Sequence, residues 1–333
     1  MSVASGDLNR LRALIVGCGN IAGGFDQARA PDDLPYTHAG AYVRDGRFNI
    51  TACVEPDDAR RAGFMAAWGV PTGFRSTDEI LDSGYQFDVI SICSPTSCHA
   101  HDLEIALRLK PKLIFCEKPF TASLADTERL AEECRKSNVL LAVNHTRRWD
   151  PDVIKLQADM QAEKWGQLRS VVGYYNKGIL NNGSHMLDLL HLLVGSMSIV
   201  KVGKPVHDFF PNDPAVPVWL EGANGLPVQL VCGHAEDYAI FELQLVFSRG
   251  VLSMEEGGMY WCERRAIDST TFKGYRKLEE RVRREGKYPS AMLQAANNIY
   301  LAINQGDSLA STGDSALAAQ RVCEQIKQQA LAL

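Results

Sequence analysis

The sequence has no long apolar run, no surplus of positive charge and no closely spaced pairs of cysteines. No uninterrupted apolar stretch approaches the roughly 18 residues that a membrane-spanning helix needs. The 35 lysines and arginines against 40 aspartates and glutamates give a net charge of −5, which argues against nucleic-acid and anionic-membrane partners. The nine cysteines are spread over the chain without a CxxC pair, which indicates reduced thiols. We therefore expect a cytoplasmic protein with no metal site and with neither a nucleic acid nor a membrane as partner.

The order of apolar segments divides the 333 residues into two parts near residue 150. In residues 1–150, short apolar runs alternate with helical patterns, which is typical of a parallel, doubly wound sheet. The expected strands are 13–16, 49–54, 88–93, 112–116 and 139–143, with helices at 100–109 and 124–137. The sequence therefore predicts an α/β domain over residues 1–150.

Residues 151–333 have a different pattern, in which apolar and polar residues alternate along the strands. Such alternation is typical of a half-solvated antiparallel sheet. Helices at 184–194 and 290–303 are expected to cover one face of this sheet, and the charged run 276–284 is expected to form a solvated helix or loop. The expected strands are 168–175, 216–220, 228–232, 240–247 and 251–254. The sequence thus predicts a second domain, of α+β class with an open, mostly antiparallel sheet, whose free face forms a homodimer or homotetramer.

A glycine-rich loop, Gly17–Ala22, directly follows the first expected strand. Its pattern GxGxxA lets the backbone turn tightly and approach a pyrophosphate, whose charge is held by amides at a helix start. Gly17, Gly19, Asn20 and Ile21 are therefore the expected cofactor contacts in this loop. The alternative is a tight turn without a ligand.

The acidic partner of such a loop is expected about 20 residues further on. Here the best candidate is Glu55, 36 positions after Gly19, and the extra length lies in residues 23–35. An insertion at this place is expected beside the cofactor crevice. Glu55 would accept hydrogen bonds from the adenosine ribose and repel a 2′-phosphate, which favours NAD. Arg60 and Arg61 leave NADP open, although solvated positions on the next helix are their simpler interpretation.

Two further motifs follow strands that are expected to end at the same edge of the sheet. Glu117-Lys118-Pro119 follows the strand 112–116, and a segment from Ser94 to His99 follows the strand 88–93. Ligands bind at the carboxyl ends of the strands in such folds. The expected cofactor contacts at this edge are Ser94, Pro95, His99 and Glu117.

The chain resembles the Gfo/Idh/MocA oxidoreductases in several motifs that occur in the same order. They are Gly17-x-Gly19-x-x-Ala22, Ser94-Pro95-x-x-x-His99, Glu117-Lys118-Pro119, the segment 144–151 and Gly183-Ser184-His185-Met186-Leu187-Asp188, followed by Ser311-Thr312-Gly313-Asp314. The resemblance covers essentially the whole chain. It implies an N-terminal Rossmann domain over residues 1–150, a substrate-binding and oligomerisation domain over residues 151–333, and NAD(P)-dependent chemistry on sugars or polyols.

The same resemblance implies that Lys118 is the active-site lysine and that His185 exchanges the proton of the substrate hydroxyl. The family often has aspartate four residues before this histidine, whereas this chain has Asn181. An amide binds a hydroxyl but does not raise the pKa of His185 or Lys118 as a carboxylate would. We expect Asn181 to position the substrate in the catalytic site.

The chemistry of hydride transfer gives the same two residues their roles. Oxidation of a secondary alcohol needs a group that removes the hydroxyl proton and a group that stabilises the developing carbonyl oxygen. Lys118 suits the oxygen and His185 suits the proton, and both are expected to act at the same nicotinamide. Ser184 is expected to cap the following helix, which would keep His185 neutral at the positive helix end. Asp188 would either orient His185 or bond a backbone amide.

Four residues are candidates for binding the substrate itself. Arg148 and Trp149 follow the strand 139–143, and Tyr175 and Lys177 end the strand that leads to Asn181. Aromatic faces stack on sugar rings and cations bind phosphates, although ordinary packing or solvent exposure is an equal alternative for each residue. The sequence therefore predicts an NAD(P)-dependent oxidoreductase of a sugar, a nucleotide-linked sugar or a cyclic polyol. The alternative is a non-catalytic sensor of the same fold that binds cofactor and sugar.

Overall fold

The computed structural model describes residues 10–30 and 32–333, which fold into two compact units. Unit 1 comprises the described residues up to Trp149 together with Pro289–Leu317, and unit 2 comprises Asp150–Tyr288 and Ala318–Leu333. The units are therefore not two consecutive stretches of chain. Pro289–Leu317 returns to unit 1, although the sequence analysis assigned all residues after 150 to a second domain.

Unit 1 contains a six-stranded parallel sheet in the order β3-β2-β1-β4-β5-β6. Its strands are β1 (Leu11–Val16), β2 (Phe48–Val54), β3 (Thr72–Phe74), β4 (Val89–Ile92), β5 (Leu113–Cys116) and β6 (Leu140–Val143). The helices are α1 (His38–Asp45), α2 (Asp58–Trp68), α3 (Asp78–Leu81), α4 (His99–Arg108) and α5 (Leu124–Lys136). All five expected strands are confirmed, and only the three-residue β3 was not predicted. The strand order reverses between β1 and β4, which is where doubly wound sheets bind ligands.

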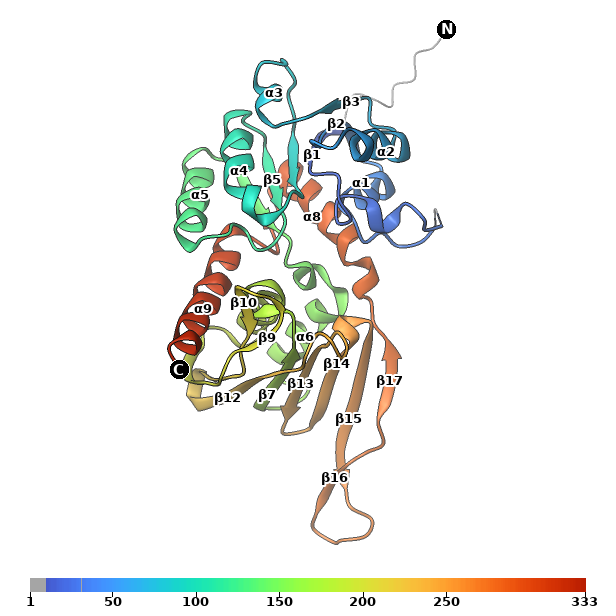
Figure 1. Ribbon diagram of the computed structural model, residues 1–333. Helices are drawn as coiled ribbons and strands as arrows, with labels where there is room; N and C mark the ends of the chain where they lie inside the picture. Colours follow the sequence, from blue (N-terminus) through green and yellow to red (C-terminus); the bar gives the residue numbers. More distant parts are fainter. Residues whose placement is uncertain (1–9, 31) are drawn as a thin grey trace. The chain divides into compact units, whose positions relative to one another are not determined.

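The central strands of unit 1 are buried on both faces, which explains their continuous apolar runs. On one face, Leu14, Ile90 and Ile114 pack against Leu103 of α4 and Leu130 of α5. Figure 1 shows α4 and α5 beside β5. The other face of the sheet is covered by α1, which in turn packs against α8 (Ala291–Gln305).

The position of α8 corrects the expectation that this helix covers the second sheet. In unit 1 the guanidinium of Arg47 donates to Asn297 at 2.8 Å and lies 4.2 Å from the ring centroid of Tyr300. Met292, Ala295 and Ile299 form its buried stripe, and such residues give the periodicity that predicted the helix. An apolar stripe predicts that a helix is covered but not which sheet covers it.

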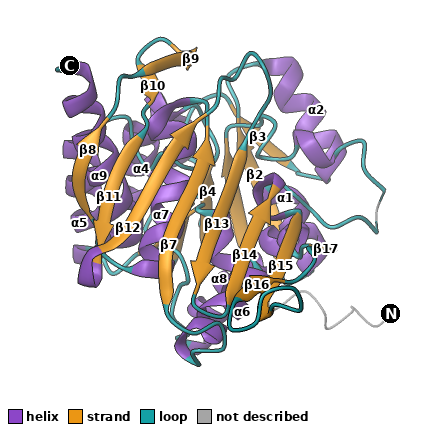
Figure 2. Ribbon diagram, turned by 90° about the horizontal axis from the view of Figure 1, so that it is seen from below, coloured by secondary structure: helices purple, strands orange, loops and turns teal. Residues whose placement is uncertain are grey.

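Unit 2 contains a nine-stranded mixed sheet and a two-stranded ribbon. The path of the large sheet is β16-β15-β14-β13-β7-β12-β11-β8, with β17 paired to β15, and only β7 and β12 pair in parallel. The strands are β7 (Leu168–Tyr175), β8 (Ser198–Val202), β11 (Val218–Gly222), β12 (Leu226–Cys232), β13 (Phe241–Phe247), β14 (Gly250–Glu255), β15 (Tyr260–Asp268), β16 (Arg276–Leu278) and β17 (Val282–Glu285). The ribbon pairs β9 (Val206–Phe210) with β10 (Asp213–Ala215). The predicted fold class is confirmed, with the sheet seen face-on in Figure 2.

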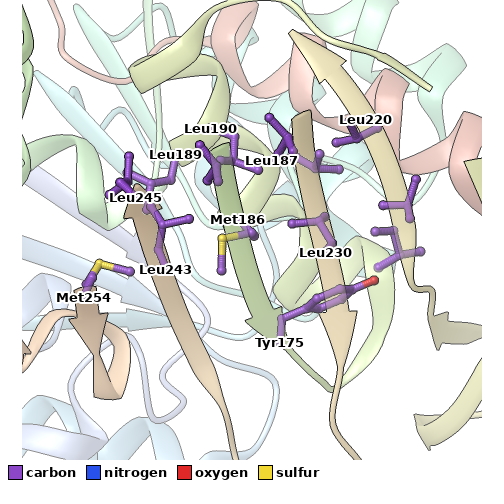
Figure 3. Close-up of a cluster of buried hydrophobic side chains, with 14 of the residues drawn as sticks. Tyr175, Met186, Leu187, Leu189, Leu190, Leu220, Leu230, Leu243, Leu245 and Met254 are labelled. Atoms are coloured by element: carbon purple, nitrogen blue, oxygen red, sulfur yellow. The ribbon is translucent and has the colours of Figure 1, made fainter. Parts of the chain in front are cut away.

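One face of the large sheet is covered by α6 (Pro151–Gln161), α7 (Ser184–Val194) and the C-terminal part of α9 (Gly313–Leu331). Figure 3 shows the apolar stripe of α7 against the strands, with Met186, Leu187, Leu189 and Leu190 beside Leu230, Leu243 and Leu245. This confirms that the stripe belongs to the core. Burial of each such side chain contributes about 1.5–3 kcal/mol to folding.

The charged run 276–284 is neither a helix nor a plain loop, because β16 and β17 occupy its two ends. Most of their side chains are exposed, as expected for strands at a sheet edge, so no apolar alternation marks them. The guanidinium of Arg284 on β17 lies 3.0 Å from the carboxylate of Asp152 on α6. Separately, none of the helices within residues 10–30 and 32–333 is both long and apolar enough to cross a membrane.

Candidate functional site

The glycine loop of unit 1 begins where β1 ends, and Gly17 has no room for a side chain. Its amide donates to the Val54 carbonyl at 2.8 Å, and its φ of +85° is in the left-handed region. A Cβ at this position would lie 2.6 Å from the backbone nitrogen of Ser94 in the loop after β4. The first glycine therefore brings the loops after β1 and β4 together at the point where the strand order reverses.

Gly19 has the opposite environment. A Cβ at this position would meet no protein atom within 4 Å, so nothing in the fold itself requires a glycine there. In a dinucleotide fingerprint the second glycine lets the pyrophosphate approach the backbone. Asn20 is exposed and Ile21 is half-buried beside it. The open space at Gly19 fits a cofactor that comes close to the loop.

The extra residues before Glu55 lie between the glycine loop and α1 in the sequence. The amides of His38 and Ala39, at the start of α1, donate to the carbonyls of Ile21 and Ala22 at 3.2 and 2.8 Å. The turn after the loop is thus hydrogen-bonded to the start of α1, although residues 23–37 separate the two in the sequence. These residues account for 15 of the 36 positions between Gly19 and Glu55. Without them the spacing is close to the roughly 20 residues of the fingerprint.

The two ends of this insertion are joined by one carboxylate. Asp26 accepts hydrogen bonds from the amides of Tyr36 and Thr37, at 3.0 and 2.9 Å, and from the Thr37 hydroxyl at 2.6 Å. Thr37 in turn caps α1 by accepting from the Gly40 amide. A capped helix start therefore follows the glycine loop in space, even though residues 23–37 separate the two in the sequence.

Glu55 lies directly after β2, with only 4% of its surface exposed. Its carboxylate accepts from the amide of Cys18 in the glycine loop at 3.0 Å and from the guanidinium of Arg60 at 3.2 Å. Arg61 donates to the Glu55 carbonyl at 2.6 Å. The arginines are therefore not merely solvated positions on α2. Both contact the acid that the sequence analysis placed at the ribose.

We expect the substitution Glu55→Gln to weaken the preference for NAD over NADP by about tenfold, which corresponds to roughly 1.4 kcal/mol. It removes the negative charge that opposes a 2′-phosphate and frees Arg60 from its ion pair. The ratio of the dissociation constants for NAD and NADP, measured by calorimetry, checks this. Asp58→Asn removes a nearby exposed charge and serves as the control. An equal change of the ratio in both variants would contradict a specific role for Glu55.

The loop after β4 is tied to the loop after β5 by His99. Its Nε2 lies 2.8 Å from the Ser94 carbonyl oxygen, and its Nδ1 lies 3.0 and 3.1 Å from the carbonyl oxygens of Pro119 and Phe120. The ring is 99% buried by these neighbours, with 1% of the residue exposed. His99 therefore holds the two loops together, and its burial leaves little surface for the predicted contact with the cofactor. Pro95 is exposed at the edge, and the Ser94 hydroxyl donates to Asp102 at 2.6 Å.

Lys118 follows β5, and the carboxylate of Glu117 anchors its backbone. Glu117 accepts from the Lys118 amide at 3.3 Å, from the Asn144 side chain at 2.6 Å and lies 3.0 Å from Nε2 of the fully buried His38. Burial acts to raise the pKa of Glu117, but the hydrogen bonds from His38 and Asn144 and the charges of His38 and Lys118 together hold it below its usual value. A buried carboxylate thus stays ionised beside Lys118.

His38 is a site residue that the sequence analysis missed. Its Nδ1 lies 3.2 Å from the hydroxyl of Ser91, which lies 2.8 Å from the hydroxyl of Tyr42. All three side chains are buried, so this network fixes the Glu117 carboxylate from the protein interior. A histidine shortly after the glycine loop could have pointed to His38. Residues 23–37 separate His38 from that loop in the sequence, so the pattern was not recognised.

Arg148 and Trp149 lie in a short helical turn after β6, where the structure gives Trp149 a packing role in place of the predicted stacking on a sugar. Trp149 is 2% exposed, and its indole nitrogen donates to Asn298 of α8 at 2.9 Å. Its ring lies edge-on to Phe115 with centroids 5.8 Å apart. Arg148 donates to the Ala310 carbonyl at 3.3 Å.

In unit 2, Tyr175 at the end of β7 is a core residue and not a ligand contact, which corrects another prediction. It is fully buried, and its hydroxyl donates to the Val216 carbonyl at 2.9 Å and accepts from the Val216 amide at 2.8 Å. Burial raises the pKa of this phenol well above its ordinary value. The strand alternation places Tyr175 on the covered face, so its ring is unavailable to a sugar.

The residues after β7 form a π-helical turn, Gly178–Gly183, that continues directly into α7. Asp213 of β10 accepts from the amides of Leu180 and Asn181, both at 2.9 Å, at the start of this helical stretch. The Asn181 side chain donates to the Lys177 carbonyl at 3.0 Å, a bond that an aspartate carboxylate does not make. This contact accounts for asparagine at a position where the family often has aspartate.

His185 is the second residue of α7, but the helical stretch begins seven residues earlier. Ser184 does not cap α7, because its hydroxyl donates to the Asn181 carbonyl at 3.1 Å. The predicted location of His185 at an open, positive helix end is therefore wrong. Its ring lies edge-on to Phe241 with centroids 6.4 Å apart, and Asp188, one turn later, is buried.

The structure brings the sequence-predicted residues together in two groups. The glycine loop, Glu55, Ser94 and Glu117-Lys118 gather at the carboxyl edge of the sheet in unit 1. Asn181 and His185 share one helical stretch in unit 2, and Lys177 directly precedes it. Within residues 10–30 and 32–333, no cluster of three or more histidine, cysteine, aspartate or glutamate residues is arranged to hold a metal ion.

Comparison with known proteins adds a family match for unit 1. Residues 11–145 match the Gfo/Idh/MocA family, described as an oxidoreductase family with an NAD-binding Rossmann fold. The matched segment contains the glycine loop, Glu55 and Lys118. It therefore covers the group of site residues in unit 1.

Individual relatives extend the similarity to the rest of the chain. Myo-inositol 2-dehydrogenase of Thermotoga maritima is 35% identical over 89 residues, which are 27% of this chain and 26% of that protein. Inositol 2-dehydrogenase of Rhizobium meliloti is 22% identical over 304 residues, which are 85% of this chain and 89% of that protein.

A solved structure shows the same fold over the whole chain. An oxidoreductase from Agrobacterium radiobacter, crystallised with NAD+, L-tartaric acid and magnesium, superposes with a TM-score of 0.75 at 15% identity. The match covers 97% of this chain and 96% of that one. Likeness at this identity concerns the fold alone.

Proposed function

Because residues 11–145 place the chain in the Gfo/Idh/MocA oxidoreductase family, we propose that it is an NAD(P)-dependent dehydrogenase of a sugar, a nucleotide-linked sugar or a cyclic polyol. The observation that carries this proposal is the edge of the sheet in unit 1. There, Gly19 leaves open space for a pyrophosphate, Glu55 lies beside the loop, and Glu117 anchors Lys118 nearby. The relatives named as inositol dehydrogenases support catalysis over the sensor alternative.

The proposed cofactor contacts follow from this edge. The glycine loop holds the pyrophosphate through its amides, and Glu55 accepts hydrogen bonds from the adenosine ribose. Pro95 and Glu117 complete the crevice, since both lie at the ends of neighbouring strands. When bound, the nicotinamide supplies the acceptor for the hydride.

The proposed catalytic roles divide proton and oxygen chemistry between two residues. His185 takes the proton of the substrate hydroxyl, and Lys118 donates a hydrogen bond to the oxygen as it becomes a carbonyl. Asn181 lies one helical turn before His185, and its side-chain oxygen is the part that faces the substrate in this proposal, since its nitrogen donates to Lys177. Oxidation of the alcohol yields a ketone, reduced cofactor and one proton on His185.

Cofactor reduction in the presence of a substrate panel tests this function. The purified protein is mixed with NAD or NADP and with neutral sugars, sugar acids, nucleotide-linked sugars and inositols, and formation of reduced cofactor is followed by its near-ultraviolet absorbance. We expect turnover with at least one member and preference for NAD. Binding of cofactor and sugar without any reduction, in either direction, would favour the sensor.

We further propose that the protein forms a homodimer or homotetramer in the cytoplasm. The face of the large sheet opposite the core carries Tyr174, Trp219 and Val231, and Trp219 is 47% exposed. Such rings are common in the centre of subunit interfaces. All nine cysteines are free thiols, which supports a reducing compartment. A monomeric mass in light scattering across working concentrations would reject the oligomer.

A further inference from the structure

Lys177 has a backbone conformation that is costly for a lysine. Its φ is +63°, in the left-handed region, where glycine or asparagine is the usual choice. Residues held in this region are strained and persist where the surrounding structure imposes them. The contacts that hold Lys177 in this conformation are therefore informative.

The ribbon β9-β10 imposes this conformation. Asp208 of β9 is 8% exposed, and its carboxylate accepts from the Lys177 amide at 2.8 Å. Asp213 of β10 lies against Gly178, whose φ is +87°, and accepts the amides of Leu180 and Asn181. Two carboxylates of one ribbon thus hold the chain on both sides of Lys177.

The ammonium group of Lys177 lies over an exposed aromatic ring. Its Nζ is 5.3 Å from the ring centroid of Phe209, a residue that is 55% exposed. Across residues 10–30 and 32–333 Lys177 forms no ion pair with a carboxylate. By contrast, Lys155 and Lys164 in the same unit both pair with Asp159. The charge of Lys177 is therefore held in place but not neutralised.

Lys177 also lies close in the chain to the predicted catalytic residues. It directly precedes the π-helical turn that begins at Gly178, and Asn181 lies within that turn. The Asn181 side chain donates to the Lys177 carbonyl at 3.0 Å, and His185 follows at the start of α7. All three residues are half-buried. A cation, an amide and an imidazole therefore occur together within residues 177–185.

We propose that Lys177 binds an anionic group of the substrate, a carboxylate or a phosphate, while His185 meets the hydroxyl that is oxidised. This inference rests on the proposed function and narrows it to an acidic sugar or a sugar carrying a phosphate. Phe209 provides an apolar face beside the anion, on which a sugar ring packs. The strained backbone places the charge where the substrate, and not a protein carboxylate, pairs with it.

The test compares matched ligands on matched variants. Binding of D-glucose, D-glucuronate and D-glucose 1-phosphate to the NAD-loaded protein is measured by calorimetry, together with kcat/KM for any that are oxidised. Lys177→Asn removes the charge but suits the left-handed backbone, and Lys177→Arg retains the charge. Lys110→Asn is the control, because Lys110 is an exposed lysine of unit 1 that also has positive φ.

We expect the protein to bind an acidic ligand more tightly than glucose, and Lys177→Asn to weaken that binding roughly 10- to 100-fold, as expected for loss of a charge-assisted hydrogen bond. Binding of glucose and the melting temperature should stay unchanged, and Lys177→Arg should keep most of the affinity. The carboxylate and phosphate arms show which anion is preferred.

The inference is overturned if no acidic ligand binds better than glucose, or if Lys177→Asn changes acidic and neutral ligands alike, which would make Lys177 a packing partner of Phe209 only. These outcomes are distinct from failure of the proposed function. Tight, Lys177-dependent binding of an acidic sugar without cofactor reduction would reject the dehydrogenase while leaving the anion site intact. If neutral sugars are oxidised and Lys177→Asn leaves that oxidation unchanged, the dehydrogenase stands and the anion site is rejected.

Discussion

Replacing Lys118 by alanine is expected to lower kcat by roughly 10²- to 10³-fold or more, because it removes the donor to the oxygen that develops carbonyl character. The dissociation constant for NAD should change by less than about twofold, since Lys118 is not among the groups proposed to hold the pyrophosphate or the adenosine ribose. Its backbone amide, which donates to Glu117, is retained in the variant. Initial rates of cofactor reduction and calorimetric titration with NAD measure the two quantities.

Lys112→Ala is the matched control for this substitution. Lys112 precedes β5 at the opposite end of the same strand, and its ammonium pairs with Asp88 at 3.1 Å. We expect kcat to remain near the wild-type value. If Lys118→Ala keeps wild-type turnover, or if both variants lose it equally, the proposed role of Lys118 as the oxygen-stabilising residue is wrong.

Replacing each of the two loop glycines by alanine is expected to affect a different property, stability for Gly17 and NAD binding for Gly19. Gly17→Ala should lower the free energy of unfolding by about 1–3 kcal/mol, because the new Cβ meets the Ser94 backbone and the backbone has positive φ. Gly19→Ala should leave that free energy unchanged, since its Cβ meets no protein atom, yet weaken NAD binding at least about tenfold by filling space needed by the pyrophosphate.

Chemical denaturation without cofactor and calorimetry with NAD separate these effects. Gly46→Ala offers a control for positive φ alone, because Gly46 has φ of +77° and no atom within 4 Å of its Cβ. Gly46→Ala should lower the free energy of unfolding, and its folded fraction should bind NAD as tightly as the wild-type protein does. Unchanged NAD affinity in Gly19→Ala would mean that no pyrophosphate approaches this loop. That result would contradict the proposed cofactor site.

The central strands of unit 1 were predictable because they are buried on both faces. Burial on both sides requires a continuous apolar run, as in Leu113–Cys116, and the intervening helices can be recognised by their own periodicity. The edge strands β16 and β17 of unit 2 were not predictable in this way. Their side chains are mostly exposed, so hydrogen bonding to β15 and not burial keeps them in the sheet.

The candidate site was predictable where backbone conformation or position after a strand marks a residue. Gly17, Glu55 and Lys118 lie at strand ends, and their neighbours in the structure follow from the order of the sheet. Tyr175 and Trp149 were misjudged because an aromatic residue near a crevice has the same sequence signature whether its ring faces a ligand or the core. The burial of each ring, and its hydrogen-bond partner, decided between them.

The sequence by itself determined the fold class, the glycine loop and the resemblance to the family, because these depend on local periodicity and on short motifs whose residue types have few physical substitutes. Tertiary structure alone decided that α8 joins unit 1, that His38 supports Glu117, and that two carboxylates of the β9-β10 ribbon hold the backbone around Lys177. These features join residues that are distant in the chain. Such pairings depend on which surfaces meet when the chain folds, and a one-dimensional pattern does not contain that information.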